Sequence, residues 1–326
     1  MRFALMIESQ QGLSYGDHVA IAKRAEANGL EALFRSDHYT SFPGPPGKPT
    51  TDAWTVLAGL ARETDRLGLG VLVSPVTFRH PGSFAKVVTT VDEMSGGRIE
   101  VGVGAGWNEL DHRGLGLAFP PIKTRADLME DELAILHGLW GEPDGWSYEG
   151  HLVTIKDALF YPKPVDVPGR PRTPIGGARP RLIVGGQGSP RSFRLAARYA
   201  DEFNLSSAGP DKAREAFAAA DAACEAIGRA PGTLTHSAMA GVLIGRTEAE
   251  MAARLSVAVR AFGSGDDEGA WLTERLERWI TGTPDVAREA VRRFAAAGVE
   301  RIMLQDFLPW DLDMIDVMGE ALVGQV

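Results

Sequence analysis

The chain has 326 residues, of which 44% are hydrophobic and 24% are charged, and its net charge is −9. This is an ordinary globular composition, and the negative charge argues against general nucleic-acid binding. No apolar run approaches the roughly 18 residues of a membrane span, and the one at the N-terminus is too short for a signal peptide. The single cysteine, Cys224, excludes an internal disulfide and fits the reducing cytoplasm, where we expect the protein.

Apolar runs that favour strands alternate along the chain with amphipathic stretches that favour helices. The strands are predicted at residues 2–7, 30–34, 67–75, 98–104, 181–186, 201–205, 234–245 and 301–305. The helices are predicted at residues 17–28, 51–64, 83–94, 124–139, 189–200 and 211–227, in stretches up to residue 297, and at the C-terminus.

The predicted strands are continuous apolar runs, which is typical of a parallel sheet covered on both faces. Eight strand–helix units predict a single (β/α)8 domain, a TIM barrel, over residues 1–326, with an open doubly wound sheet as the alternative. A long insertion rich in proline and glycine, residues 141–181, interrupts the alternation and contains a predicted hairpin near residues 151–155. Because such long loops are usually functional, we expect it to cover one end of the barrel as a lid.

Basic residues gather between Lys163 and Arg198. Eight basic residues and one acidic residue, Asp166, give this segment a charge of +7 (8 − 1) in an otherwise anionic protein. The segment fits either a solvated face or a binding surface for an anionic ligand.

Polar residues follow the predicted strands, at the ends that converge on one mouth of a barrel. They are Glu8, Arg35 to His38, Ser74 to His80, Gly104 to Glu109, Gly185 to Ser189, Gln305 and Asp306. His38, beside Asp37, is the acid–base candidate because imidazole titrates near neutral pH, and a purely structural hydrogen bond is the alternative. No H-x-H or H-E-x-x-H spacing supports a metal site, so we expect none from Asp37, His38, His80, Asp111 and His112.

Two glycine-rich turns follow predicted strands. In VGGQGSPRS (184–192) the turn leads into a helix with Ser189 as its N-cap, whose free N–H groups favour an anion such as a phosphate. A tight turn that needs glycine for its dihedral angles is the alternative. GVGAGWNE (102–109) departs from the dinucleotide-binding pattern G-x-G-x-x-G, and its small residues would leave room for a flat ring or a phosphate.

Several segments together resemble the luciferase-like monooxygenase superfamily, most strongly its branch of oxidoreductases that depend on the deazaflavin coenzyme F420. They are SDHY (36–39), LVSPVTFRHP (72–81), SGGRIEVGVGAGWNE (95–109), ALFYPKPV (158–165) and RLIVGGQGSPRSFRLAARYADEFN (181–204). The resemblance implies a TIM barrel that binds a flavin-type cofactor in its mouth, against a bulge, often with a non-prolyl cis peptide, between Val71 and Ser74.

The resemblance also implies roles for single residues. Asp37 and His38 are expected near the reacting ring, with His38 as proton donor or substrate clamp. The sequence assigns no chemical role to Arg35, and a surface-directed partner for a neighbouring carboxylate is one interpretation of it. The expected cofactor-binding residues are Ser36, Val71, Leu72, Val73, Ser74, Gly104, Ala105, Gly106, Trp107, Gly185, Gly186, Gln187, Gly188 and Ser189.

Three functions follow from the resemblance. The leading one is hydride transfer between F420, whose oligoglutamate tail would suit the +7 segment, and a small organic substrate. The second is an FMN-dependent monooxygenase that uses reduced flavin and O₂ and needs a flavin reductase, and the third is a non-catalytic flavin-binding barrel. Sugar-phosphate dehydrogenases of this superfamily carry a glutamate after the G-x-G-x-G turn, where this chain has Trp107, so a hydrophobic or planar substrate is expected. Packing of Trp107 within the barrel is the alternative. A homodimer is a further family expectation.

Overall fold

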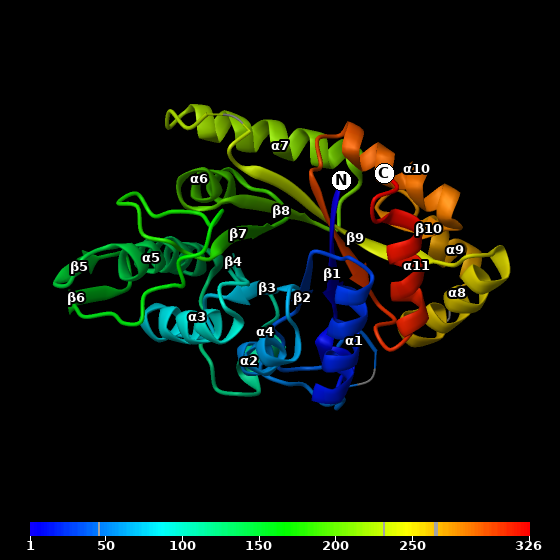
Figure 1. Cartoon of the computed structure of the whole chain (residues 1–326), viewed down its shortest axis with the longest axis horizontal. Helices are drawn as coiled ribbons and strands as arrows, with labels where there is room; N and C mark the ends of the chain where they lie inside the picture. The colour runs from blue at the N-terminus through cyan, green and yellow to red at the C-terminus, as the bar shows by residue number, and fades with distance from the viewer. Residues whose placement is uncertain (45, 231, 264–266) are drawn as a thin grey trace.

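A computed structural model of the protein describes residues 1–44, 46–230, 232–263 and 267–326 and shows a ring of parallel strands surrounded by helices (Figure 1). The ring closes because β1 pairs with both β2 and β11, and β8 pairs with β9. The eight strands of the ring are β1 (Arg2–Ile7), β2 (Ala32–Arg35), β3 (Gly68–Pro75), β4 (Ile99–Gly104), β7 (Arg181–Gly186), β8 (Glu202–Ser206), β9 (Thr235–Ile244) and β11 (Arg301–Asp306). The predicted (β/α)8 barrel is confirmed.

Helices cover the outside of the barrel. They are α1 (Tyr15–Ala27), α2 (Ala53–Glu63), α3 (Pro81–Ser95), α5 (Ile122–Gly141), α6 (Pro190–Tyr199), α7 (Pro210–Glu225), α8 (Glu248–Phe262), α9 (Glu268–Thr273), α10 (Pro284–Ala296) and α11 (Leu312–Leu322). Many begin at side-chain caps, such as Ser14 before α1 and Asp52 before α2, which satisfy backbone N–H groups of the first turn. Two short helices, η1 (Ser9–Gln11) and α4 (Glu109–Arg113), lie at the mouth and were not predicted.

One predicted helical stretch is wrong. A short strand, β10 (Trp279–Gly282), pairs with β9 outside the ring, where the sequence pattern favours a helix. Its four residues are too few to establish a strand pattern against flanking helical residues.

The insertion does not cover the mouth, so the lid prediction is wrong. It contains the predicted hairpin, β5 (Trp146–Glu149) and β6 (Thr154–Ala158), whose turn donates backbone hydrogen bonds to Asp131 of α5. In Figure 1 the hairpin lies beyond α5, away from the ring of strands. The physical reason is connectivity: the insertion follows a helix and precedes a strand, so it leaves the barrel at the end opposite the mouth.

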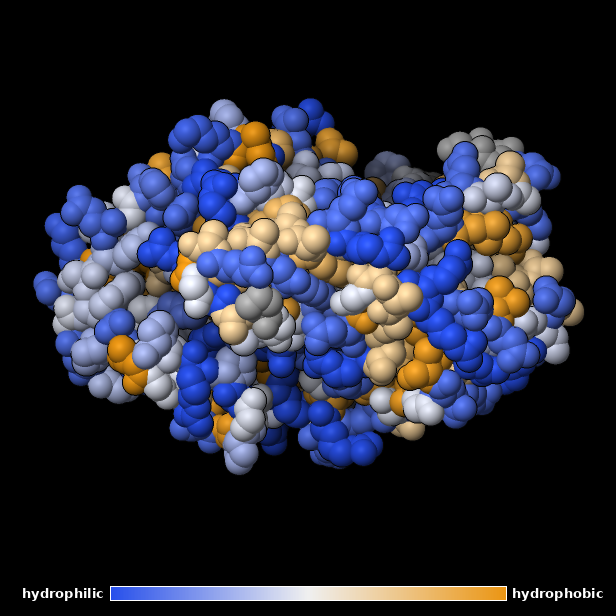
Figure 2. All heavy atoms as spheres, turned by 90° about the horizontal axis from the view of Figure 1, so that it is seen from above, coloured by the Kyte–Doolittle hydropathy of each residue, from blue (hydrophilic) through white to orange (hydrophobic). Residues whose placement is uncertain are grey.

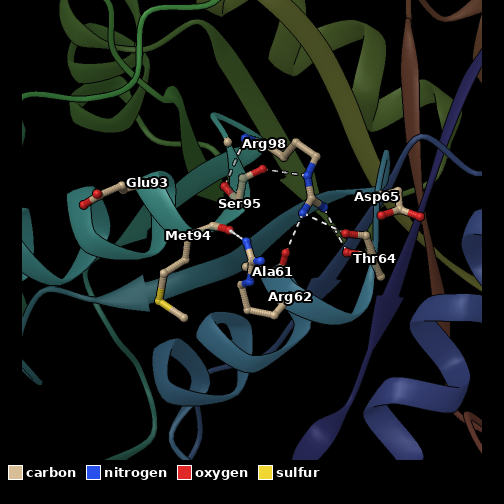
Figure 3. Close-up of a pocket in the computed structure, with 9 residues that line it drawn as sticks. Ala61, Arg62, Thr64, Asp65, Glu93, Met94, Ser95 and Arg98 are labelled. Carbon is tan, nitrogen blue, oxygen red and sulfur yellow. Dashed lines mark hydrogen bonds between the residues drawn. The ribbon is translucent and has the colours of Figure 1, made fainter.

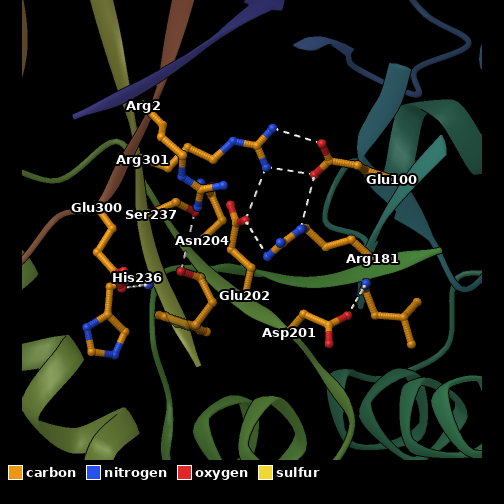
Figure 4. A network of polar contacts seen from close by, with 12 residues as sticks. Arg2, Glu100, Arg181, Asp201, Glu202, Asn204, His236, Ser237, Glu300 and Arg301 are labelled. Atoms are coloured by element: carbon orange, nitrogen blue, oxygen red, sulfur yellow. Dashed lines mark hydrogen bonds and ion pairs between the residues drawn. The ribbon is translucent and has the colours of Figure 1, made fainter. Parts of the chain in front are cut away.

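A buried ionic network fills the interior at that opposite end (Figure 4). Arg301 of β11 is 1% exposed, and its Nη1 lies 2.7 Å from Glu100 Oε2 and 3.1 Å from Glu202 Oε2. Its Nε also contacts Glu31. Buried charges are tolerated when they are paired, as these are. The side chains of the network fill this end of the barrel, so the mouth is its open end.

The surface is largely polar. On the face shown in Figure 2, hydrophobic residues occur in small groups among hydrophilic ones. In the part of the chain that the structure describes, no helix is long and apolar enough to cross a membrane. Cys224 is buried in α7, so it is a core thiol.

Candidate active site

The mouth of the barrel holds a cavity of about 780 Å³. Residues from the ends of several barrel strands and from α5 and α6 line it, which is the arrangement expected of a barrel active site. The predicted site residues that line it are Ser36, Asp37, His38, Leu72, Val73, Gly104, Ala105, Gly106, Trp107, Gly185, Gly186, Gln187, Gly188 and Ser189. Val71 and Ser74 lie elsewhere: Val71 packs in the outer core, and Ser74 accepts a hydrogen bond from Trp54 Nε1 at 2.9 Å.

An apolar shelf, formed by Leu72 and Val73, makes one wall of the cavity. The peptide bond between these two residues is cis, and the pairing of β3 with β4 shifts register between Val71 and Ser74. Both features were expected from the family resemblance. The register shift places two consecutive side chains of β3 at the cavity, where a regular strand would point only one of them inward.

The glycines of the G-x-G-x-G turn are needed because this bulge lies against them. A Cβ on Gly102 would lie 2.4 Å from the backbone oxygen of Val71, and a Cβ on Gly104 would lie 2.4 Å from Val73 Cγ2. On β7, a Cβ on Gly185 would lie 2.7 Å from Val73 Cγ1. The expectation that these glycines leave room for a ligand is therefore incomplete, since Gly102 and Gly104 first make room for the chain itself.

His38 lies at the cavity with one ring nitrogen fixed. Its Nδ1 is 2.6 Å from Asp111 Oδ2, on α4. Its Nε2 is not fully buried and makes no hydrogen bond to any residue that the structure describes. Since His38 lines the cavity, this nitrogen faces it. Sequence reasoning considered Asp111 only for a metal site, because nothing in the sequence places it next to a residue 73 positions earlier.

Asp37 is held by a different partner. Arg79 Nη1 donates to Asp37 Oδ2 at 2.6 Å, and the same guanidinium contacts Asp52 and donates to Tyr39 Oη at 3.0 Å. Burial raises the pKa of Asp37, and the charge of Arg79 opposes this shift. Asp37 therefore lines the cavity as part of an ion-pair network and makes no bond to the neighbouring His38.

Arg35 is buried, and the expectation that it faces the surface is wrong. It is 1% exposed, and it donates to the backbone oxygens of Ser36 and Thr51 and to Thr51 Oγ1. Burial lowers its pKa to about 10. These bonds tie the end of β2 to the loop before α2, so Arg35 has a structural role.

A chain of hydrogen bonds at the mouth was also missed. Glu8 accepts from Gln10 Nε2 at 2.7 Å and from Gln305 Nε2 at 2.5 Å, and Ser36 Oγ donates to Gln10 Oε1 at 2.5 Å. All four residues line the cavity. Glu8 and Gln305 were recognised at strand ends, but three polar side chains joined around one carboxylate cannot be predicted from their positions in the chain.

The turn before α6 has the predicted geometry. Ser189 is the N-cap, its side chain accepts from Ser192 N at 3.1 Å, and Pro190 follows at the first helical position. Gly188 has φ +84°, so glycine is also required there for the backbone conformation. The turn and the start of α6 line the cavity, where the helix N-terminus can receive an anion.

The segment from Lys163 to Arg198 does not form a surface of free cations. Five of its seven arginines pair within the chain: Arg170 with Asp92, Arg172 with Asp166, Arg179 with Asp201, Arg181 with Glu100 and Glu202, and Arg191 with Asp127 and Glu130. The other two, Arg194 and Arg198, are exposed on α6 and form no ion pair with the described residues. Of the segment's basic residues, only Arg191 lines the cavity. The expected anion-binding surface is therefore reduced to Arg191 and the turn before α6.

A second, smaller cavity of about 280 Å³ lies where α2 and α3 end, opposite the mouth (Figure 3). Arg98 lines it and uses all five of its N–H donors, on the carbonyl oxygens of Ala61, Thr64, Leu67 and Ser95 and on Thr64 Oγ1. Arg98 therefore caps helix ends and offers no donor to a ligand. In the described residues, no group of three or more His, Cys, Asp and Glu side chains could hold a metal ion.

Comparison with known proteins identifies the family. The sequence model of the luciferase-like monooxygenase family matches residues 1–301. The chain belongs to this family.

Individual known proteins are only distantly similar to this chain. An F420-dependent glucose-6-phosphate dehydrogenase of Microbacterium testaceum is 32% identical over 189 residues, 57% of this chain and 51% of that protein, so the chain spans about half the length of this curated relative. An F420-dependent secondary alcohol dehydrogenase, solved with an F420–acetone adduct, has a TM-score of 0.80 at 19% identity. The match covers 100% of this chain and 99% of the dehydrogenase chain. The monooxygenase RslO1 from Streptomyces bottropensis has a TM-score of 0.79 at 20% identity, with 99% of each chain covered. At these identities the two structures establish only the shared fold.

Proposed function

We propose that this protein is an oxidoreductase that transfers a hydride between coenzyme F420 and a small, uncharged organic substrate. The observation that carries the proposal is the placement of His38 Nε2 at the cavity that the apolar Leu72–Val73 shelf also lines. An apolar wall suits a flat ring, and a histidine near it can exchange a proton with the substrate. The relatives named above support F420 as the cofactor.

The residues present fit such a cofactor. The Leu72–Val73 shelf would support the ring, and the turn from Gly185 to Ser189, with Arg191, would receive the phosphate at the N-terminus of α6. When bound, the deazaflavin ring supplies the carbon that accepts or donates a hydride. The chain's own contribution is to orient the substrate, exclude water and exchange a proton at His38 Nε2.

The mouth favours an uncharged substrate. Phe42 and Trp107 pack edge-to-face on His38, with ring centroids 4.5 and 5.7 Å from it, and they form an aromatic wall. The one arginine that lines the cavity, Arg191, is bonded to Asp127 and Glu130, so it is a poor partner for a substrate phosphate in addition to the cofactor. A hydrophobic or planar substrate therefore suits this cavity better than a sugar phosphate.

Titration of the purified protein with F420, reduced F420, FMN and reduced FMN, followed by fluorescence, tests the proposal. We expect micromolar binding of F420 and much weaker binding of FMN. Binding of FMN without F420 would favour the FMN-dependent monooxygenase, which needs a flavin reductase as partner. Because most basic residues between Lys163 and Arg198 are paired, we now expect salt to weaken F420 binding only modestly. The single-domain organisation, the homodimer and the cytoplasmic location stay predictions.

A further inference from the structure

The buried carboxylate of Asp111 accepts four hydrogen bonds, and its two oxygens have different partners. Oδ1 accepts from the backbone N–H groups of Tyr39 and Thr40, at 3.0 and 2.8 Å, and from Thr40 Oγ1 at 2.6 Å. Oδ2 accepts from His38 Nδ1 at 2.6 Å. Asp111 is 1% exposed, although it lies in the cavity wall beside His38. The carboxylate therefore binds the loop with one oxygen and the imidazole with the other.

This arrangement determines which nitrogen of His38 carries the proton. Burial opposes ionisation of Asp111, but the hydrogen bonds from His38 and Thr40 outweigh it and hold the pKa of the carboxyl below its usual value. An ionised carboxylate only accepts hydrogen bonds, so Nδ1 must be the protonated nitrogen. In neutral His38 the lone pair then lies on Nε2, which faces the cavity. Asp37 does not orient His38, because its carboxylate is bonded to Arg79.

We propose that Asp111 is the positioning residue that holds His38 in the Nδ1–H tautomer, with Nε2 ready to accept the substrate proton. The catalytic part of this inference rests on the proposed function. With oxidised F420 bound as the hydride acceptor, the C–H bond of a substrate with a hydroxyl group would break, and its hydride, with the electron pair, would pass to F420. The O–H electron pair forms the carbonyl, and the proton goes to His38 Nε2. The resulting imidazolium is stabilised by Asp111, and carbonyl reduction is the same step reversed.

The substitution Asp111→Asn predicts a specific change. Three donors already point at the Oδ1 position, so the amide oxygen of the new side chain stays there and its NH₂ group faces His38. An NH₂ group can only donate, so Nδ1 must become the acceptor and the proton moves to Nε2. The lone pair then no longer faces the cavity. Thr40→Val is the matched control, because it removes one bond to Oδ1, and the 3.3 Å bond from Asn108 Nδ2, but leaves the bond between Oδ2 and His38.

Nitrogen-15 NMR of the histidine rings tests the tautomer without cofactor or substrate, and His38→Gln identifies the His38 signals by their loss. We expect Nδ1–H in the wild type and in Thr40→Val, and Nε2–H in Asp111→Asn. A wild-type spectrum showing Nε2–H would overturn the proposal even if Asp111→Asn did not fold. An unchanged tautomer in folded Asp111→Asn would overturn it equally.

F420 titration and turnover complete the test. For Asp111→Asn we expect kcat to fall by at least about 100-fold, with the F420 dissociation constant within about threefold of the wild type. Wild-type kcat in a variant with the reversed tautomer would contradict the positioning role. If the wild type did not bind F420, the proposed function would fail, whereas the tautomer result would stand by itself.

Discussion

At the scale of single residues, Asp37 and His38 are adjacent in the sequence but do not pair with each other. Asp37 is bound by Arg79, whereas His38 is bound by Asp111 from the helix after β4. His38 is thereby oriented by a carboxylate while its other nitrogen faces the cavity. Adjacent residues at a strand end can thus belong to separate networks, because their side chains point in different directions.

Replacing His38 by Gln tests the role of this residue directly. We expect kcat to fall by about 100-fold or more, with F420 affinity within about threefold of the wild type, because the variant keeps polarity but cannot exchange a proton. The measurement is steady-state turnover together with F420 titration. His80→Gln is the control, since His80 caps α3 outside the cavity. Wild-type turnover in His38→Gln would favour a role for His38 outside the chemistry.

At the scale of elements, β3, β4 and β7 form one unit around the Leu72–Val73 shelf. The register shift of β3 is accommodated only because Gly102 and Gly104 of β4 and Gly185 of β7 lack side chains. The glycine-rich turn that resembles a ligand-binding motif is therefore also a packing requirement, and the two roles are linked through the position of Val73.

Gly104→Ala should disturb the cavity through this contact. The added Cβ would lie 2.4 Å from Val73 Cγ2, so Val73 must move. We expect F420 affinity to fall by about 10-fold or more and the free energy of unfolding to fall by about 1–3 kcal/mol, as for other overpacked cores. F420 titration and urea unfolding measure the two effects. Gly16→Ala in α1, where a Cβ meets only Ser14 Oγ at 3.7 Å, is the control and should be neutral or slightly stabilising. Unchanged affinity in Gly104→Ala would show that the shelf does not contact the cofactor.

At the scale of the whole molecule, two buried carboxyl groups affect stability without a part in the proposed chemistry. Burial raises the pKa of Glu132 in α5 to about 8, against the opposing charge of Arg79. Burial also raises the pKa of Asp306 at the end of β11 to about 7. Both groups are neutral in the folded protein at acidic pH and ionise more readily in the unfolded chain.

The pH dependence of stability follows with a definite sign. Because the pKa of Glu132 is higher in the folded state than the usual 4.5, the free energy of unfolding should fall as pH rises from about 4.5 to about 8. Glu132→Gln should remove this part of the slope, on the order of 2–4 kcal/mol across that interval. Urea unfolding at both pH values measures it, with Glu93→Gln at the surface as control. Equal slopes in Glu132→Gln and the wild type would contradict the account.

The sequence predicted the barrel because most strands of the ring are apolar runs that alternate with helical patterns, and it predicted the cavity because strand ends converge in a barrel. What it could not provide is the partner of each side chain. The arginines between Lys163 and Arg198 add up to a cationic segment, yet the carboxylates that neutralise Arg170 and Arg191 lie in α3 and α5. Likewise, the bond between His38 and Asp111 joins the loop after β2 to α4, which only the fold of the barrel brings together.

The structure of the protein crystallised with F420 tests the central claim most directly. The account predicts the deazaflavin ring against the Leu72–Val73 shelf, the phosphate at the turn from Gly185 to Ser189, and His38 Nε2 facing the reactive side of the ring across the substrate space. A ring bound away from the shelf, or with its reactive carbon out of reach of a substrate bonded to His38, would contradict it.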